Sequence, residues 1–474
     1  MPLVKTWQLI AGSAVAGLAL SAAVVASAGP WDSGQRKAER DRAASWSRTG
    51  GADHGSGSGP GGLPQAAPSA PGVLQGVGPG RAQAAAPDGL ASALRPLLAD
   101  PALGTVRTAS VVDTATGQVL YESGSRDAMT PASTVKIATA AAALAALGPE
   151  HRIRTTVAPG DAAGQIVLVG GGDPSLTAKT KNPGPGGNLV KLAGDTAQAL
   201  KAAGTYTVTL GYDDSLYTGP ARHPIGDNPN IALVTSLAAD EGRPDDSTSG
   251  PVERVEDPAK ETARAFAALL AERGVKVTGA PARAKPAAGA QPLAVTLSTP
   301  LSGLVERMLT NSDNDIAEAL ARQTALASGQ PASFEGAEKA VAARLSSLGV
   351  DVSGSRFADG SGLNRADKVS AGLLTGLLSK AAGPDHPELR PVLTGLPVAG
   401  FTGTLRARNS GSSPAAGLLR AKTGTLSGVN SLSGTVVDRS GRLLAFAFLT
   451  ANTPGPEGAE KALDKLAAAV AAAP

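Results

Sequence analysis

The sequence contains no cysteine, which excludes disulfide bonds, a thiol nucleophile and cysteine-ligated metal sites. Aromatic residues make up only 3% of the chain, so its hydrophobic core must be built from Ala, Val and Leu. The four histidines stand singly, mostly beside Gly, Pro or Asp, and form neither an H-E-x-x-H motif nor a credible Ser-His-Asp arrangement. We therefore expect no metal, no cofactor and no histidine base.

A strong excess of charge of either sign is also lacking. The formal net charge is only +3, and no stripe of Lys and Arg appears along the chain. This composition argues against nucleic acid as a partner. With 474 residues, of which 42% are hydrophobic, the chain is long enough for one large domain with additions.

The N-terminal segment has no charged residue between positions 6 and 31. The apolar run follows a single lysine and ends near Ala26-Ser27-Ala28, which has the small-x-small form of a signal-peptidase site. At roughly 20 residues it is also long enough to span a bilayer uncleaved. We predict that residues 1–31 are a signal peptide or a membrane anchor and that the chain is exported to the outer face of the membrane or the cell wall. The basic residues that follow, which the positive-inside rule would keep in the cytoplasm, do not support export.

The chain after this segment divides by composition. Residues 32–87 are rich in Gly, Pro, Ser and Ala, which predicts a disordered linker. Residues 107–123 read as a hairpin, and three further strands lie between residues 418 and 450, followed by a last helix. Strands at both ends with helices between them predict an α/β (α+β) fold, with one antiparallel sheet fed by both ends of the chain and covered by helices.

The stretch "PASTVK" places Ser133 three residues before Lys136 at the mouth of an Ala-rich helix. Residues i and i+3 share a helix face, so the Lys amine can reach the Ser hydroxyl and remove its proton when the amine is neutral. The helix start offers free N–H groups to negative charge that develops on an acyl oxygen. The pattern alone is weak, because a polar helix start beside a solvated Lys is common.

Two later stretches strengthen this interpretation. Ser312-Asp313-Asn314 stands at a polar break between two helices, and Lys422-Thr423-Gly424 lies on a predicted strand. S-x-x-K, S-D-N and K-T-G, in this order, are the motif set of penicillin-binding proteins and class A β-lactamases.

With these motifs, and with "GGGDPSL", "DGSGLNR" and "LPVAGFTGTLRAR", the chain from about residue 88 onward resembles the class C low-molecular-mass penicillin-binding proteins, the DacB-like D-alanyl-D-alanine carboxypeptidases and endopeptidases. The resemblance implies a penicillin-binding-protein/β-lactamase-like transpeptidase fold with an inserted subdomain. Residues 88–150 and 295–474 would form the catalytic domain and residues 151–294 the insert. The stretch DGSGLNR has Asn364 where the family pattern has Ser.

The resemblance also implies roles for the matched residues. Ser133 would attack the carbonyl between two D-alanines of a peptidoglycan stem peptide, and Lys136 would take its proton. Ser312, Asn314 and Lys422 would pass a proton to the leaving amine, hold the substrate amide and keep the site electropositive. The substrate carboxylate would meet the hydroxyls of Thr423 and Thr425, while Gly424 would let the strand come close to substrate. β-Lactam antibiotics would be covalent inhibitors.

Two further substrate-binding residues are expected on weaker grounds. A carboxylate at Asp173, in "GGGDP", could meet the free amine of a diaminopimelate side chain, although an Asp before Pro174 is equally typical of a turn. Arg365 could approach the same pocket or lie on the surface.

Two other functions fit the same residues. One is a β-lactamase of the same fold, against which stands the lack of an E-x-x-L-N stretch after Ser312 that could supply a base for deacylation. The other is a non-catalytic cell-wall-binding module, against which stand three intact motifs. The choice between carboxypeptidase and endopeptidase cannot be read from the sequence.

Overall fold

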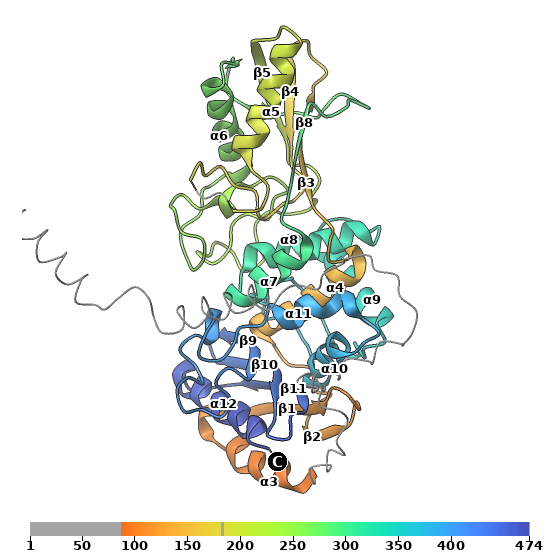
Figure 1. Ribbon diagram of the computed structural model, residues 1–474, viewed down its shortest axis with the longest axis vertical. Helices are drawn as coiled ribbons and strands as arrows, with labels where there is room; N and C mark the ends of the chain where they lie inside the picture. The colour runs from red at the N-terminus through yellow and green to blue at the C-terminus, as the bar shows by residue number, and fades with distance from the viewer. Residues whose placement is uncertain (1–86, 182–183, 474) are drawn as a thin grey trace, which may run out of the picture. The chain divides into compact units, whose positions relative to one another are not determined.

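The computed structural model describes residues 87–181 and 184–473 (Figure 1). The predicted signal or anchor, and the predicted linker apart from its final residue, lie outside the described residues. No helix in the described ranges is long and apolar enough to cross a bilayer.

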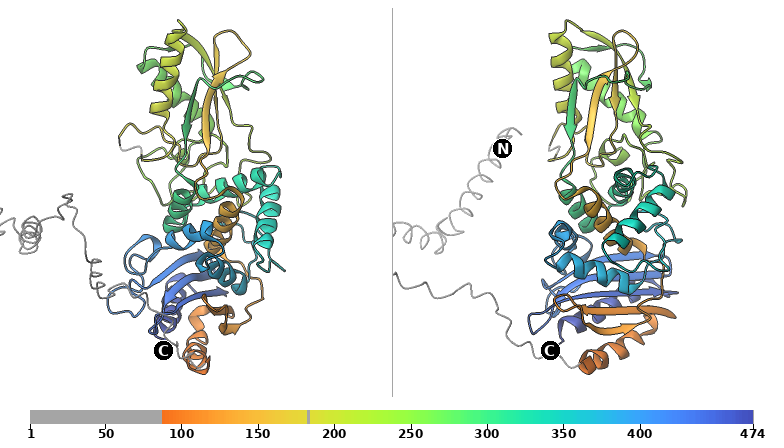
Figure 2. Two further views of the ribbon diagram at one scale, coloured as in Figure 1. Left: turned by 45° about the vertical axis from the view of Figure 1, so that its right-hand side comes forward. Right: turned by 90° about the vertical axis from the view of Figure 1, so that its right-hand side faces the viewer.

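The first and last strands of the described chain pair with each other in a five-stranded sheet (Figures 1 and 2). The order is β2-β1-β11-β10-β9, and every neighbouring pair is antiparallel. The strands are β1 (Val106–Asp113), β2 (Val119–Ser123), β9 (Leu419–Leu426), β10 (Val429–Val437) and β11 (Leu443–Ala451). The predicted sheet, to which both ends of the chain contribute, is therefore confirmed.

Alternation along β11 divides the core into two layers, because successive side chains of a strand point to opposite faces. Leu444, Phe446 and Phe448 pack with one apolar cluster, whereas Ala445, Ala447 and Leu449 pack with the other. The first cluster is covered by α3 (Pro87–Leu98) and α12 (Pro456–Ala471), which contact each other. Small Ala side chains on the other face leave room for helices to approach the sheet closely.

The second face of the sheet carries the helices that position the motifs (Figure 2). In chain order they are α4 (Lys136–Leu147), α7 (Leu301–Asn311), α8 (Asn314–Ala327), α9 (Phe334–Ser347), α10 (Ala371–Ala382) and α11 (Arg390–Thr394). Helix α4 is buried along most of its length, which explains why it is composed almost wholly of Ala, Leu and Ile. Of these helices, the sequence does not predict α9, α10 or α11.

A second sheet lies between α4 and α7 in the chain. It contains β3 (Arg154–Pro159), β4 (Gln165–Val169), β5 (Thr207–Asp213), β6 (Lys276–Val277), β7 (Ala282–Arg283) and β8 (Ala294–Leu297). Helices α5 (Leu189–Ala202) and α6 (Pro258–Glu272) pack with it around a separate apolar cluster. The strand β5 pairs in parallel with β4, β6 and β7, so this sheet is mixed.

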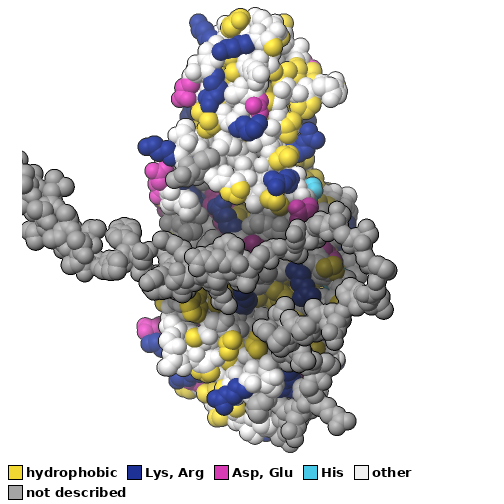
Figure 3. Space-filling view, viewed as in Figure 1, with side chains coloured by type: hydrophobic (Ala, Val, Ile, Leu, Met, Phe, Trp, Pro, Cys, Tyr) yellow, Lys and Arg dark blue, Asp and Glu magenta, His cyan; other side chains and the backbone are white. Residues whose placement is uncertain are grey.

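Charged side chains are scattered over the visible face of the part formed by the second sheet, α5 and α6 (Figure 3). Lys and Arg side chains stand singly there, with acidic and apolar side chains between them.

Candidate active site

Ser133 lies in a tight turn that leads directly into helix α4. A 3₁₀ turn spans Ala132–Val135, and α4 begins at Lys136, so Ser133 precedes the α-helix rather than opening it. Ala132 has a φ of 49°, in the left-handed region that residues with a Cβ rarely adopt. Such strain is held only where the surrounding structure enforces it, which marks this turn as a site built for function.

The Lys136 amine joins three segments of the chain. Its Nζ lies 2.9 Å from Ser133 Oγ, 2.7 Å from Asn314 Oδ1 and 2.6 Å from the carbonyl oxygen of Ser361. A neutral amine can donate to the amide and carbonyl oxygens and still accept from the Ser133 hydroxyl through its lone pair. An ammonium would donate to all three oxygens, so the geometry accommodates either form of Lys136.

Burial favours the uncharged form. The Lys136 side chain is fully buried, and the loss of hydration lowers its pKa to about 8, against the opposing effect of Asp359, Glu318, Asp313 and Asp367. At neutral pH a useful fraction of this amine is then able to accept a proton.

The S-D-N motif connects α7 to α8 at the edge of the same site. Ser312 ends α7 in a left-handed conformation, with φ 59°, and the Asp313 side chain caps α8 by accepting from the N–H of Ile316. Asn314, the first residue of α8, thereby faces Lys136.

The K-T-G motif lies on strand β9, at the edge of the first sheet. The Nζ of Lys422 donates to Ser312 Oγ at 2.9 Å and to the carbonyl oxygen of Thr423 at 2.8 Å. Its side chain is fully buried, and burial together with the charge of Lys136 holds the pKa of Lys422 well below its usual range. The structure thus brings the five predicted catalytic residues into one contiguous set.

Gly424 was expected to let its strand come close to the substrate, but its close neighbours belong to the protein itself. A Cβ on Gly424 would lie 2.2 Å from Ser431 Oγ and 2.7 Å from the carbonyl oxygen of Pro131. The missing side chain therefore lets β9 approach the turn that carries Ser133. On the same strand the Thr425 side chain is exposed, and the half-buried Thr423 hydroxyl donates to Thr404 Oγ1.

Ser133 lines a cavity of about 330 Å³, and residues of the segment between β5 and α6 line it as well. Asn314 Nδ2 donates to the carbonyl oxygen of Asn230 at 2.9 Å, so this segment orients the amide of the S-D-N motif. From the same segment, Asn228, Asn230, Arg243, Ser249 and Gly250 line the cavity.

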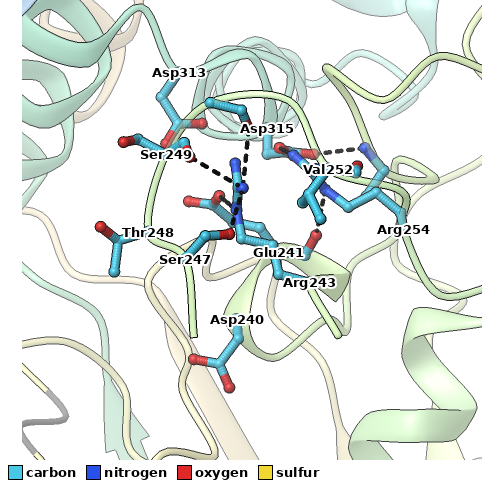
Figure 4. A network of polar contacts seen from close by, with 12 residues as sticks. Asp240, Glu241, Arg243, Ser247, Thr248, Ser249, Val252, Arg254, Asp313 and Asp315 are labelled. Atoms are coloured by element: carbon cyan, nitrogen blue, oxygen red, sulfur yellow. Dashed lines mark hydrogen bonds and ion pairs between the residues drawn. The ribbon is translucent and has the colours of Figure 1, made fainter. Parts of the chain in front are cut away.

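A network of charges anchors this segment beside the motif (Figure 4). Arg254 pairs with Asp315 at 2.8 Å, and Arg243 pairs with the buried Glu241 at 2.9 Å. Arg307, on α7, bridges Glu241 and Asp313. Burial and the nearby charge of Asp313 raise the pKa of Glu241 to about 8. These polar contacts fix one wall of the cavity against α7 and α8.

The two remaining predicted residues lie apart from Ser133. Asp173 is buried and accepts hydrogen bonds from the N–H and the hydroxyl of Ser175. This is the arrangement of a turn-forming Asp, the alternative to a residue that binds the substrate amine. It borders a different cavity, and burial raises its pKa to about 6. The exposed Arg365 donates to the carbonyl oxygen of Ser427, which connects the DGSGLNR loop to the turn after β9.

Sequence reasoning missed the contributions of the segment between β5 and α6. The Asp, Pro and Gly residues of this stretch show no periodicity from which a structure could be predicted. It also missed the role of the DGSGLNR loop, in which the Asp359 carboxylate accepts from the N–H groups of Ser361, Gly362 and Asn364. A short acidic residue followed by Gly-Ser-Gly is the signal that could have indicated such a turn.

Comparisons with known proteins agree on one family. The family described as D-Ala-D-Ala carboxypeptidase 3 (S13) matches residues 90–242 and 241–471. Carboxypeptidase DacB of Mycolicibacterium smegmatis is 40% identical over 389 residues, which cover 80% of this chain and 83% of that protein. The D-alanyl-D-alanine carboxypeptidase of Actinomadura sp. is 32% identical over an alignment that covers 76% of this chain and 80% of that protein.

A solved structure shows the same fold. The crystal structure of penicillin binding protein 4 (dacB) from Haemophilus influenzae aligns with a TM-score of 0.63 at 22% identity. The alignment covers 80% of this chain and 97% of that one. The predicted penicillin-binding-protein-like fold is confirmed.

Proposed function

Because this chain belongs to the D-Ala-D-Ala carboxypeptidase 3 (S13) family, and is thus a serine-type DD-peptidase that acts on peptidoglycan, we propose that Ser133 is its nucleophile and Lys136 its general base. The observation that carries this assignment is the fully buried Lys136 amine, 2.9 Å from Ser133 Oγ. In the proposed reaction, Lys136 removes the hydroxyl proton while Ser133 Oγ adds to the carbonyl between two D-alanines.

The other motif residues complete the reaction. Ser312 passes a proton to the leaving amine, and Lys422, in contact with its hydroxyl, assists that proton transfer. Asn314 has one N–H engaged by Asn230, which leaves the second N–H for a substrate carbonyl. Water then releases the acyl group from Ser133 and restores the enzyme.

Strand β9 provides the surface for the substrate. The hydroxyls of Thr423 and Thr425 receive the terminal carboxylate, and the backbone N–H groups of Ser133 and Thr425 stabilise the oxyanion. Gly424 acts indirectly, by letting the strand lie against the turn that carries Ser133. Arg365 secures the loop at the end of this strand, whereas the placement of Asp173 gives no support to a role in binding an amine.

The proposal extends to organisation and inhibition. Residues 151–294 form the inserted subdomain, and residues 88–150 and 295–474 form the catalytic domain. Residues 1–31 direct export, as a signal peptide or as a membrane anchor, so that the enzyme meets peptidoglycan outside the membrane. β-Lactams acylate Ser133, since they present a strained amide in the place of the D-Ala-D-Ala bond.

Defined muropeptides and a fluorescent penicillin test this proposal together. We expect loss of one D-Ala from a pentapeptide, cleavage of a cross-linked dimer, or both, read by mass. We also expect one stable penicilloyl group per chain, located on the peptide that contains Ser133. Rapid turnover of nitrocefin without an adduct would instead indicate a β-lactamase, and an unlabelled protein that leaves muropeptides intact would indicate a non-catalytic module.

A glycine in the DGSGLNR loop gives a sharp test of the geometry. Gly362 has a φ of +84°, and a Cβ there would lie 2.1 Å from the carbonyl oxygen of Ala132 and 2.9 Å from the N of Ser133. We expect Gly362→Ala to slow acylation by about 100-fold, because the turn that bears the nucleophile must shift. Its free energy of unfolding should fall by about 2–4 kcal/mol, measured by urea denaturation.

Gly441→Ala is the matched control. Gly441 has almost the same φ, +83°, but nothing lies within 4 Å of the added Cβ. It should lose only about 1 kcal/mol and acylate normally. Equal acylation rates for the two variants would show that the close approach at Gly362 is unimportant.

A further inference from the structure

A buried charge cluster behind Lys136 includes a histidine that no motif contains. His223 lies in the segment between β5 and α6, and its side chain is 1% exposed. Its Nε2 is 3.1 Å from Asp359 Oδ2 and 3.6 Å from Glu318 Oε1. Three distant parts of the sequence therefore meet at this imidazole.

The two carboxylates hold the loop that binds Lys136. Glu318 Oε1 accepts from the N–H groups of Gly360 and Ser361 at 3.0 and 2.9 Å. Asp359 accepts from the N–H groups of Ser361 and Gly362. The carbonyl oxygen of Ser361, fixed in this way, then accepts from Lys136 Nζ at 2.6 Å.

The charges around Lys136 show why the histidine matters. Asp359, Glu318 and Asp313, and Asp367 when it is ionised, favour the ammonium form of Lys136, which cannot act as a base. Asp313 pairs with Arg307, and burial with the charge of Asp359 raises the pKa of Asp367 to about 10, so that Asp367 is neutral. The charges of Asp359 and Glu318 remain to be offset.

Two buried cations face these carboxylates. Arg322 lies one helical turn from Glu318, with its guanidinium stacked on the ring of Phe334. His223 contacts both carboxylates, and its ring meets Phe334 edge to face. The backbone N–H of Ile225 donates to Nδ1 of His223 over 3.3 Å, which is a long distance for a hydrogen bond. Protonation of Nδ1 therefore loses only a weak contact.

We propose that His223 is a positioning residue which, as an imidazolium, offsets the charges of Asp359 and Glu318 and so keeps Lys136 able to accept the proton of Ser133. The inference rests on the proposed role of Lys136. Burial lowers the pKa of His223, but the nearby carboxylates of Asp359 and Glu318 outweigh it and raise that pKa to about 9, which agrees with a charged ring at neutral pH.

The test compares the pH dependence of acylation by a fluorescent penicillin in the wild type and in His223→Gln. Gln keeps an N–H donor but carries no charge. Without the imidazolium, the two carboxylates stabilise the Lys136 ammonium, so the midpoint of the acidic limb should rise by about one pH unit. At pH 7 this shift corresponds to roughly tenfold slower acylation, which should recover at higher pH.

Phe334→Leu is the matched control, because it removes the ring packed on His223 without changing any charge. It should lower thermal stability and leave the pH midpoint unchanged. A His223→Gln variant that is slower by the same factor at every pH would show a structural role only and would overturn the proposal.

A measurement on the unsubstituted protein is independent of catalysis. With ¹⁵N-labelled histidine, we expect the signal that is missing from His223→Gln to show an imidazolium at pH 7. A neutral tautomer at pH 7, or one equivalent of a bound divalent metal that His223→Gln loses, would overturn the proposal. A wild type that no penicillin acylates would refute the proposed function, while the NMR result would still decide the state of His223.

Discussion

Replacing Ser133 with Ala is expected to abolish labelling by penicillins and to reduce release of D-Ala by on the order of 10⁴-fold or more, because it removes the hydroxyl that contacts the Lys136 amine. The residue sits in the turn before α4 and is only partly buried, so loss of one oxygen should change the free energy of unfolding by less than about 1 kcal/mol. Labelled protein on a gel and the mass of the muropeptide products measure the two effects.

Ser346→Ala serves as the control for that result. Ser346 is an exposed residue of α9, and the same substitution there should leave labelling and hydrolysis unaltered. If Ser133→Ala kept even a tenth of the wild-type acylation rate, the nucleophile would have to be another residue.

Lys136→Met is expected to slow acylation by about 10³-fold or more, since the side chain keeps its length and burial but loses the atom that accepts the proton. Lys136→Arg should be as slow, because a guanidinium remains charged and cannot accept a proton. In the wild type, the amine is neutral above its pKa of about 8, so the acylation rate should rise through that pH and then level. Stopped-flow acylation from pH 6 to 10 measures the profile.

Lys461→Met is the corresponding control, since Lys461 is exposed on α12 and pairs with Glu457 one turn away. It should acylate at the wild-type rate. An Arg variant at position 136 that retained activity, or a wild-type rate that fell as the pH rose through 8, would assign the base to a different group.

The residues that carry the chemistry could be predicted because their relationships are local or belong to a recognisable motif. Ser133 and Lys136 are three positions apart, and Asn314 is placed by an Asp cap that its own motif contains. The hydrophobic pattern of the terminal strands likewise predicted a sheet that joins both ends of the chain.

The rest depends on contacts between segments that no local pattern connects. Asn230 reaches Asn314, and Arg254 reaches Asp315, from a stretch without periodic structure. The single histidines of the sequence were read as unimportant, yet His223 is buried against Asp359, which lies far along the chain. Helix α9 begins at a Ser333 cap, a local signal that could have been recognised.

The pairing of the first strand with the last has a consequence for biosynthesis. The long-range partner of β1 within the first sheet is β11, which ends at Ala451, near the end of the chain. Ser133 therefore cannot meet Lys422 in a completed sheet until β11, which lies far along the chain from β1, has been synthesised.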